Sequence, residues 1–240
     1  MNNIANAFSR AMQRAESRHA VPIKFAGNTL FVDGAGCLFW PAHDMLIVSD
    51  LHFEKGSYFA VLGSPVPNYD SRKTLQQLAH VIKAYQPRHT VCLGDSFHDQ
   101  RAWQRLDESL KVTLRDLIQQ SDRWTWIVGN HDPELPEALS GEVAHTLVYE
   151  NVLLSHEPEC PLPAGAEAQI FGHFHPKLSY KVARQRLTGK CAVYHEHRLI
   201  MPAFGAYTGG LSIDDPAITE LVPKLNRRAV LLYADKAIPL

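Results

Sequence analysis

Short apolar runs, each ended abruptly by polar residues, recur between residues 45 and 175 of the chain. An aspartate, an asparagine or a histidine follows each run, in every case directly after a glycine or a serine. The five runs are Met45–Val48, Thr90–Leu93, Trp124–Val128, Asn151–Leu154 and Ala168–Phe171. Runs of this length that end at a breaker are typical of buried strands. The polar residues therefore stand at the C-terminal ends of strands, the edge where α/β sheets bind ligands.

These strand ends supply carboxylates, one amide and several imidazoles. In chain order they are Ser49-Asp50-Leu51-His52, Gly94-Asp95, Gly129-Asn130-His131-Asp132, His156 and Gly172-His173-Phe174-His175. Such oxygen and nitrogen ligands suit two divalent cations about 3.5–4 Å apart, which can clamp a phosphate and activate water. One Asp-x-His or Gly-Asp pair alone is most often a capped turn. The complete series predicts a two-metal site, whose glycines let the backbone approach a ligand closely.

The first half of the chain predicts a parallel sheet preceded by a meander. Short apolar stretches at 22–25, 30–32 and 37–40 indicate antiparallel strands that lead into the strand at 45–48. Helical spacing predicts helices over 71–85, capped by Asp70 or Ser71, and over 101–120. The alternation of strand and helix through residue 130 implies parallel pairing.

The second half predicts strands with almost no helix between them. They cover residues 178–182, 191–194, 199–201 and 230–233, which suggests a second, more antiparallel sheet. Pro158–Gly165 is expected to be a loop within the domain. His195-Glu196-His197 resembles a metal motif, but it falls where a hairpin should turn, so we interpret it as a solvated loop.

The first twenty residues contain three arginines and no apolar block, so they do not resemble a secretory signal. Ile4, Phe8, Met12 and Ala15 permit a weakly amphipathic helix. We expect a frayed terminus here. A helix that packs on a second subunit is the alternative.

Composition bears on the expected ligand and on the expected compartment. The formal net charge is −1, whereas proteins that bind nucleic acid usually show a basic excess, so the charge counts modestly against DNA binding. The four cysteines form no Cys-x-x-Cys pair, which favours a reducing cytoplasm over secretion. No segment has the length of a transmembrane helix, so no membrane association is expected. The oligomeric state is not predicted.

The order of motifs resembles the calcineurin-like metallophosphoesterase superfamily over about residues 45–210. The segments 49–56, 93–99 and 202–210 are similar to the PdeM family of bacterial ligase-associated DNA damage response endonucleases. Gly94-Asp95-Ser96-Phe97-His98 is also similar to SbcD-type repair nucleases. The resemblance implies an α/β fold: a four-layer α-β-β-α sandwich with two mixed sheets. We then expect residues 1–20 to be a flexible or weakly helical extension and residues 21–240 to be one metallophosphoesterase domain.

The resemblance also implies roles for the site residues. One metal would take Asp50, His52, Asp95 and His175, and the other would take Asp95, Asn130, His156 and His173. His131 would protonate the leaving oxygen, with Asp132 orienting its ring, while a hydroxide between the metals attacks phosphorus. Such ligands suit Mn²⁺, Fe or Zn²⁺ about equally. The resemblance favours Mn²⁺.

Side chains beside the motifs leave alternatives open. His98 either contacts a DNA strand or supports the metal ligands. Lys55 either meets a phosphate oxygen or is a solvated lysine. Two groups of basic residues could form faces near the site, although surface charge is the default interpretation. They are Arg184, Arg186, Lys190 and Arg198, and Arg72, Lys73, Arg101 and Arg105.

The expected function is therefore a cytoplasmic dinuclear-metal phosphodiesterase. The resemblance implies that it is an endonuclease of DNA repair that acts on single-stranded or damaged DNA, with repair ligases, helicases or nucleases as partners. One alternative is a phosphodiesterase or phosphatase acting on small nucleotides. Another is a non-catalytic, metal-stabilised scaffold of a repair complex. His131 and Asp132 argue against the scaffold, because neither is needed to hold a metal.

Overall fold

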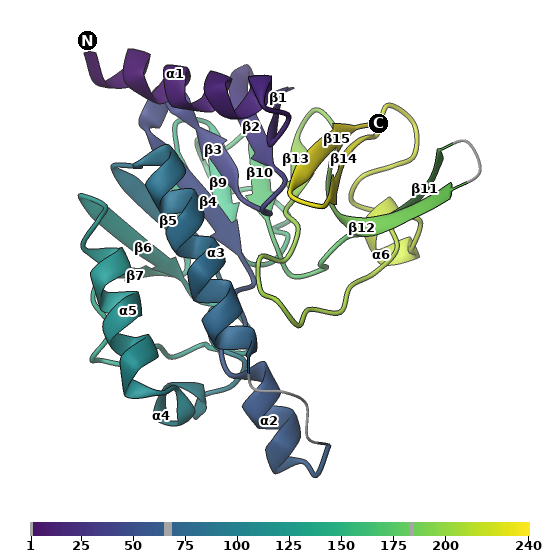
Figure 1. The fold of residues 1–240 in the computed structure, drawn as a ribbon. Helices are drawn as coiled ribbons and strands as arrows, with labels where there is room; N and C mark the ends of the chain where they lie inside the picture. The colour runs from purple at the N-terminus through teal and green to yellow at the C-terminus, as the bar shows by residue number, and fades with distance from the viewer. Residues whose placement is uncertain (1, 65–68, 183–184) are drawn as a thin grey trace.

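The computed structural model describes residues 2–64, 69–182 and 185–240, and its centre consists of two β-sheets packed face to face (Figure 1). The first sheet has the order β1-β2-β3-β4-β5-β6-β7. Its strands are β1 (Ala20–Phe25), β2 (Asn28–Asp33), β3 (Leu38–Trp40), β4 (Met45–Ser49), β5 (His89–Leu93), β6 (Arg123–Ile127) and β7 (Glu142–Ala144). Pairing is antiparallel from β1 to β4 and parallel from β4 to β7. The predicted meander and the parallel β4, β5 and β6 are confirmed.

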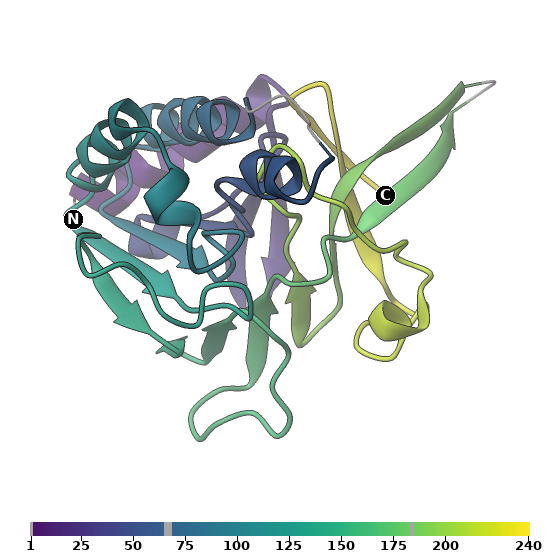
Figure 2. The same cartoon turned by 90° about the horizontal axis from the view of Figure 1, so that it is seen from below.

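The second sheet has the order β15-β14-β12-β13-β10-β9-β8, with β11 paired to β12. Its strands are β8 (Thr146–Tyr149), β9 (Val152–Ser155), β10 (Ala168–Phe171), β11 (Lys177–Val182), β12 (Gln185–Tyr194), β13 (Arg198–Ile200), β14 (Arg228–Tyr233) and β15 (Lys236–Pro239). In the described part of the chain, β10 pairs in parallel with β9 and β13 and the other pairs of this sheet are antiparallel, so the sheet is mixed and largely antiparallel, as expected. The hairpin of β11 and β12 projects from the body (Figures 1 and 2).

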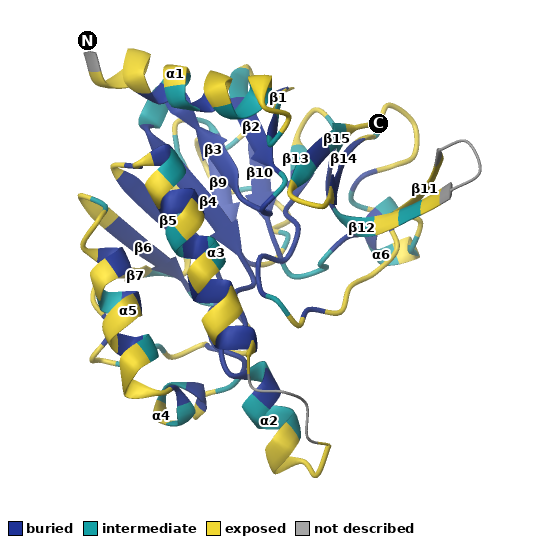
Figure 3. Cartoon of the chain, in the orientation of Figure 1, coloured by how far each residue is buried: buried dark blue, intermediate teal, exposed yellow. Residues whose placement is uncertain are grey.

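The main core fills the space between the sheets. Trp40, Ile47 and Val91 of the first sheet and Ile170 and Val230 of the second belong to one buried cluster. Helices α1 (Asn2–Glu16), α3 (Asp70–Tyr85) and α5 (Glu108–Ile118) cover the outer face of the first sheet. The central strands β3, β4, β5 and β6 are almost wholly buried, whereas these helices alternate buried and exposed residues (Figure 3). The short α6 (Pro216–Thr219) packs on the outer face of the second sheet, which completes the expected layers.

The N-terminal segment differs from the expected frayed terminus, because α1 packs on the domain. Ala7 and Ala11 have no exposed surface. Arg10 lies 2.7 Å from a carboxylate oxygen of Asp44, and Arg14 lies 2.8 Å from one of Asp33. Small apolar residues and long-range ion pairs fix this helix, and neither is conspicuous in a sequence pattern.

The expected helix over 101–120 is two helices, α4 (Ala102–Arg105) and α5, separated by Leu106 and Asp107. The Asp107 carboxylate caps α5 by accepting a hydrogen bond from the main-chain N of Ser109 (2.8 Å). The predicted cap of α3 is wrong, because Tyr69 occupies that position and makes no side-chain cap.

Asp70 and Ser71, the residues expected to cap α3, instead hold the start of α2 (Lys55–Val61), a helix that the sequence did not predict. The Asp70 carboxylate accepts from the main-chain N of Gly56 (2.9 Å), and the Ser71 hydroxyl accepts from that of Glu54 (2.8 Å). These bonds fix α2 beside the motif that follows β4.

Among the described residues, the helices are all too short or too polar to span a lipid bilayer.

Candidate metal centre

The polar motifs gather at one edge of the two sheets. Asp50 follows β4, Asp95 follows β5 and Asn130 follows β6, and the parallel register sets the ends of these strands level. In the second sheet, parallel pairing aligns Ser155 with Phe171, so His156 and His173 also leave at one edge. The predicted placement of the motifs at the C-terminal ends of buried strands is confirmed.

A first donor group consists of Asp50, His52 and His175. Nε2 of His175 lies 3.0 Å from Oδ1 of Asp50 and 3.3 Å from Nε2 of His52. Burial, the first cause, lowers the pKa of His52 to about 2, so its ring is neutral. Neutral imidazole is the form that binds a metal ion. Two ring nitrogens and a carboxylate oxygen this close together fit one divalent cation.

A second donor group consists of Asn130, His156 and His173. The amide oxygen of Asn130 lies 2.9 Å from Nε2 of His156 and 3.2 Å from Nδ1 of His173. Those two nitrogens lie 3.3 Å apart. Nδ1 of His156 donates to the main-chain oxygen of Leu93 (3.1 Å), which fixes the tautomer and leaves Nε2 free for a metal.

The carboxylate of Asp95 stands between the two donor groups. Its Oδ1 lies 3.4 Å from Nε2 of His156, and its Oδ2 lies 3.7 Å from Nε2 of His52. Each oxygen therefore faces a different group. A carboxylate in this position can share its two oxygens between two cations.

The backbone at the donors is strained. Five donor residues have a left-handed conformation that side chains disfavour: Asp50 (φ 55°), His52 (φ 46°), Asp95 (φ 47°), His173 (φ 69°) and His175 (φ 49°). Each such residue costs roughly 1–3 kcal/mol, and clusters of them mark functional sites. Residues 173 and 174 form a bend rather than an extended stretch. His173 and His175 still contact different donor groups, but through positive φ angles rather than through strand alternation.

Close packing explains two of the motif glycines. A Cβ at Gly172 would collide with the Ser49 hydroxyl and the Asp50 carboxylate. A Cβ at Gly129 would collide with the Asp95 carboxylate. Both glycines therefore permit the approach of one motif to the next.

His131 lies at the open side of the centre, and Asp132 does not act as expected from the resemblance. Nε2 of His131 is 4.0 Å from Oδ2 of Asp95, and the side chain is 41% exposed. Among the described residues, its ring hydrogen bond is from Nδ1 to the main-chain oxygen of His98 (2.9 Å), not to Asp132. The Asp132 carboxylate accepts from the main-chain N of Asp95 (3.0 Å) and of Phe97 (3.0 Å). Asp132 thus ties two motif loops together, and burial raises its pKa to about 7.

His98 and Lys55 both lie close to His52, beside the centre. Nδ1 of His98 is 3.3 Å from Nδ1 of His52, and its ring stacks on that of His131 at 4.9 Å between centroids. Burial lowers the pKa of His98 to about 4, so the ring is neutral. Lys55 opens α2, half-buried, close enough to Asp95 and Asp50 for their charges to act on its ammonium.

The basic residues group differently from the sequence-based interpretation. Lys55, Lys73, Lys177 and Lys190 lie close enough for their charges to interact, and we call them the lysine cluster. Lys190 donates to the main-chain oxygens of Ala203 (2.8 Å) and Gly205. Of the other expected cations, Arg184 lies outside the described residues.

Sequence reasoning missed Glu157 and Tyr58. Oε1 of Glu157 lies 3.6 Å from Nδ1 of His173, so it could join the second donor group. In the sequence, the one feature that could have marked Glu157 as a ligand was its position directly after His156. Tyr58 lies edge-on to His98, with 4.8 Å between ring centroids. It belongs to α2, which was not predicted.

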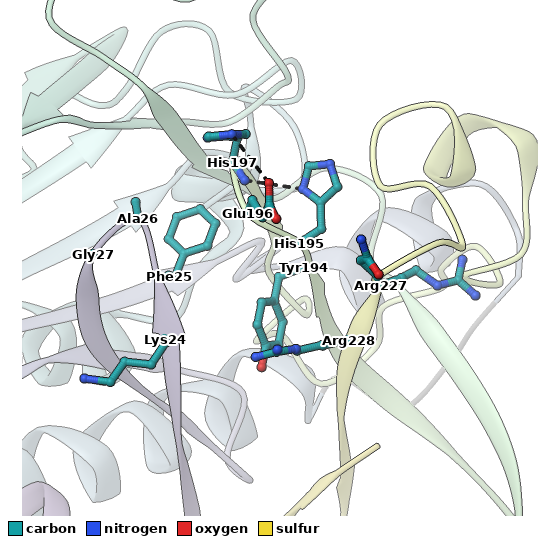
Figure 4. Close-up of a pocket in the computed structure, with 11 residues that line it drawn as sticks. Lys24, Phe25, Ala26, Gly27, Tyr194, His195, Glu196, His197, Arg227 and Arg228 are labelled. Atoms are coloured by element: carbon teal, nitrogen blue, oxygen red, sulfur yellow. Dashed lines mark hydrogen bonds and ion pairs between the residues drawn. The ribbon is translucent and has the colours of Figure 1, made fainter.

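A cavity of about 630 Å³ lies between β1 and the turn that follows β12, and it includes none of the donor residues (Figure 4). It includes Phe25, Tyr194 and Arg228 together with His195-Glu196-His197, which forms the turn between β12 and β13. Because β13 runs parallel to β10, this turn is at the opposite edge of the second sheet from Gly172. The interpretation of His195-Glu196-His197 as a hairpin turn is confirmed.

Comparison with known proteins agrees with this geometry. The family model for calcineurin-like phosphoesterases matches residues 44–175, a range that includes every donor residue described above. The chain belongs to the calcineurin-like phosphoesterase family. This family uses divalent metal ions, and the donor groups of the chain fit two of them. A comparison with curated proteins found no significant match.

Solved structures extend the comparison. The structure of the nuclease MPE of Pseudomonas putida has a TM-score of 0.69 and 27% identity, and the match covers 92% of this chain and 100% of that one. A protein of unknown function, AQ665 of Aquifex aeolicus, has a TM-score of 0.39 and 21% identity over 55% of this chain and 78% of its own. Vps29 of Entamoeba histolytica, complexed with zinc, has a TM-score of 0.36 and 14% identity over 82% and 96%.

Proposed function

We propose that this phosphoesterase is a DNA endonuclease that works with two divalent cations, Mn²⁺ in the first place. The observation that carries the proposal is the position of Asp95, with one oxygen toward each donor group. Asp50, His52, Asp95 and His175 would hold one cation, and Asp95, Asn130, His156 and His173 the other. When bound, the two cations would offset the negative charge of a phosphate and lower the pKa of water, so that a hydroxide able to attack phosphorus is available at neutral pH.

The protein's own residues supply the rest of the chemistry. Nδ1–H of His131 donates to a carbonyl, so in its imidazolium form the ring would carry a second proton at Nε2 that it can give to the leaving oxygen. Asp132 keeps the loops of Asp95 and His131 together. Lys55, whose ammonium lies near the charges of Asp95 and Asp50, would meet a non-bridging phosphate oxygen.

Two hollows support a long substrate rather than a small one. They lie on either side of the loop that contains Asn130 and Pro133, both of which line each hollow. The hollow on the His156 side measures about 310 Å³, and the hollow on the His131 side measures about 470 Å³. A strand that continues past the scissile phosphate in both directions would use both. The nuclease activity named for the MPE structure points the same way.

We also propose that the protein works in the cytoplasm. The four cysteines are unpaired, in keeping with a reducing cytoplasm. A role in DNA repair and repair proteins as partners remain predictions from the resemblance.

The test is the opening of circular single-stranded DNA in the presence of Mn²⁺. A circle has no ends, so only internal cleavage makes it linear. We expect linear product that chelation with EDTA abolishes, and little turnover of cyclic nucleotides. Hydrolysis of cyclic nucleotides or small diesters with no opened circle would instead establish the nucleotide hydrolase.

A further inference from the structure

The hollow on the His131 side is built between α2 and the segment that follows β5. It has a volume of about 470 Å³ and is lined by Tyr58, His98, Gln100, Arg101 and His131, among others. Ligand pockets typically measure roughly 300–1,000 Å³, so this one has room for a nucleoside. It begins at His131, the residue proposed to protonate the leaving oxygen.

An aromatic wall connects the hollow to the metal centre. The ring of Tyr58 meets His98 edge-on at 4.8 Å and 81°, and His98 stacks on His131 at 4.9 Å and 22°. His98 is 7% exposed, so the surrounding protein holds the ring that contacts both neighbours. The half-buried Tyr58 therefore holds a set position relative to His131.

The charges of the hollow favour an anionic chain. Asp99 would repel a phosphate, but Nη1 of Arg105 lies 3.0 Å from its Oδ1 and the main-chain N of Arg101 donates to the same oxygen. The acid is thus neutralised within the protein. The Arg101 side chain is exposed and lines the hollow.

We propose that this hollow binds the nucleoside on the leaving-group side of the scissile phosphate, with its base stacked on Tyr58 and its next phosphate at Arg101. The inference rests on the proposed function, because it identifies the leaving side by His131. Stacking of a base on an aromatic ring stabilises binding by about 1–3 kcal/mol and tolerates any base. Tyr58 therefore makes the hollow bind a nucleoside that carries a base more tightly than an abasic one, whatever the identity of the base.

The experiment uses the full chain with Mn²⁺ and a thymidine oligonucleotide that contains one abasic residue. That residue borders two phosphates, and it is the leaving nucleoside at only one of them. We expect the wild type to cut that phosphate roughly 5- to 150-fold more slowly than its counterpart in the unmodified oligonucleotide, the range that the stacking energy gives. The other phosphate should be cut at the ordinary rate.

Variants then assign the effect to Tyr58. Tyr58→Ala and Tyr58→Leu should cut both phosphates at equal rates, whereas Tyr58→Phe should keep the wild-type difference. Tyr69→Ala removes a 68% exposed tyrosine that does not line the hollow, and it should also keep the difference. Metal content and melting temperature show that each variant is folded.

The outcomes separate the two proposals. Equal cutting of both phosphates by the wild type would overturn the role of Tyr58 and leave the endonuclease standing. A difference that persists in both Tyr58→Ala and Tyr58→Leu would do the same. A wild type that binds metal but cuts no oligonucleotide would overturn the endonuclease, and the inference with it.

Discussion

The main-chain oxygen of His98 lies 2.9 Å from Nδ1 of His131. A carbonyl oxygen only accepts hydrogen bonds, so Nδ1 carries a proton and Nε2 is the atom turned toward the centre. The main chain rather than a side chain orients this ring. The acid next to His131 in sequence is thereby free to link the loops.

Replacing His131 should impair turnover and leave metal binding intact. In His131→Asn we expect the rate to fall roughly 10²–10⁴-fold on a diester with a poor leaving group, because no group protonates the departing oxygen. The loss should be much smaller on a nitrophenyl ester, whose leaving group needs no proton. Steady-state rates on both substrates, with metal analysis, check this. Equal losses on the two would show that His131 has another task.

Helix α1 should be needed for stability through Arg14. Its partner Asp33 has no exposed surface and also accepts from the Tyr85 hydroxyl (2.7 Å). Arg14→Met leaves a buried charge without its ion, which should cost roughly 3–5 kcal/mol of unfolding free energy. Arg88→Met, which removes an exposed pair with Asp122, is the matched control and should change nothing measurable. The measurement is urea unfolding of both variants. Similar midpoints for Arg14→Met and Arg88→Met would refute the role of α1.

The lysine cluster should set the salt dependence of DNA binding. Removing one lysine that contacts a phosphate should reduce the slope of log affinity against log salt by about 0.7 for single strands. We expect that reduction in Lys177→Gln. Lys24→Gln alters a lysine of the cavity at the opposite edge of the sheets and should keep the wild-type slope. Titrations of DNA affinity at several salt concentrations give the slopes of both variants. An unchanged slope in Lys177→Gln would show that the bound DNA does not contact the lysine cluster.

Lys190 should make stability depend on pH in an alkaline window. Burial, followed by the charge of Lys177, lowers its pKa to about 8 from the ordinary 10.5. Between these values the amine is charged in the unfolded chain but neutral in the folded one, so the unfolded chain binds more protons. The unfolding free energy of the wild type minus that of Lys190→Met should therefore rise with pH across the window. A flat or falling difference from urea unfolding between pH 8 and 10 would contradict this.

The sequence predicted those parts of the fold and site that depend on local pattern. Apolar runs ended by glycine or serine locate β4, β5, β6, β9 and β10, and their order places the donor residues at one edge. Helix α3 was equally clear, because Leu75, Leu78 and Ile82 recur at helical spacing within a helix of 16 residues.

The parts that were missed depend on contacts distant in sequence. Helix α2 has seven residues and starts where Asp70 and Ser71 bind it, so its own pattern is weak. Helix α1 packs on the core mainly through the small Ala7 and Ala11, with Phe8 partly buried beside them. The hydrogen bond from His131 goes to a main-chain oxygen, and no residue type in the sequence marks such a partner.

The most direct test of the account is the metal content of Asp95→Asn. Asparagine keeps the shape of the side chain and an oxygen for the main-chain N of His131, so the change removes mainly the charge and one ligand oxygen. Elemental analysis should find about two equivalents of Mn²⁺ in the wild type, about one in His156→Ala or His175→Ala, and less than one in Asp95→Asn, because the Asp95 carboxylate turns one oxygen toward each donor group. Two full equivalents in Asp95→Asn would contradict the account.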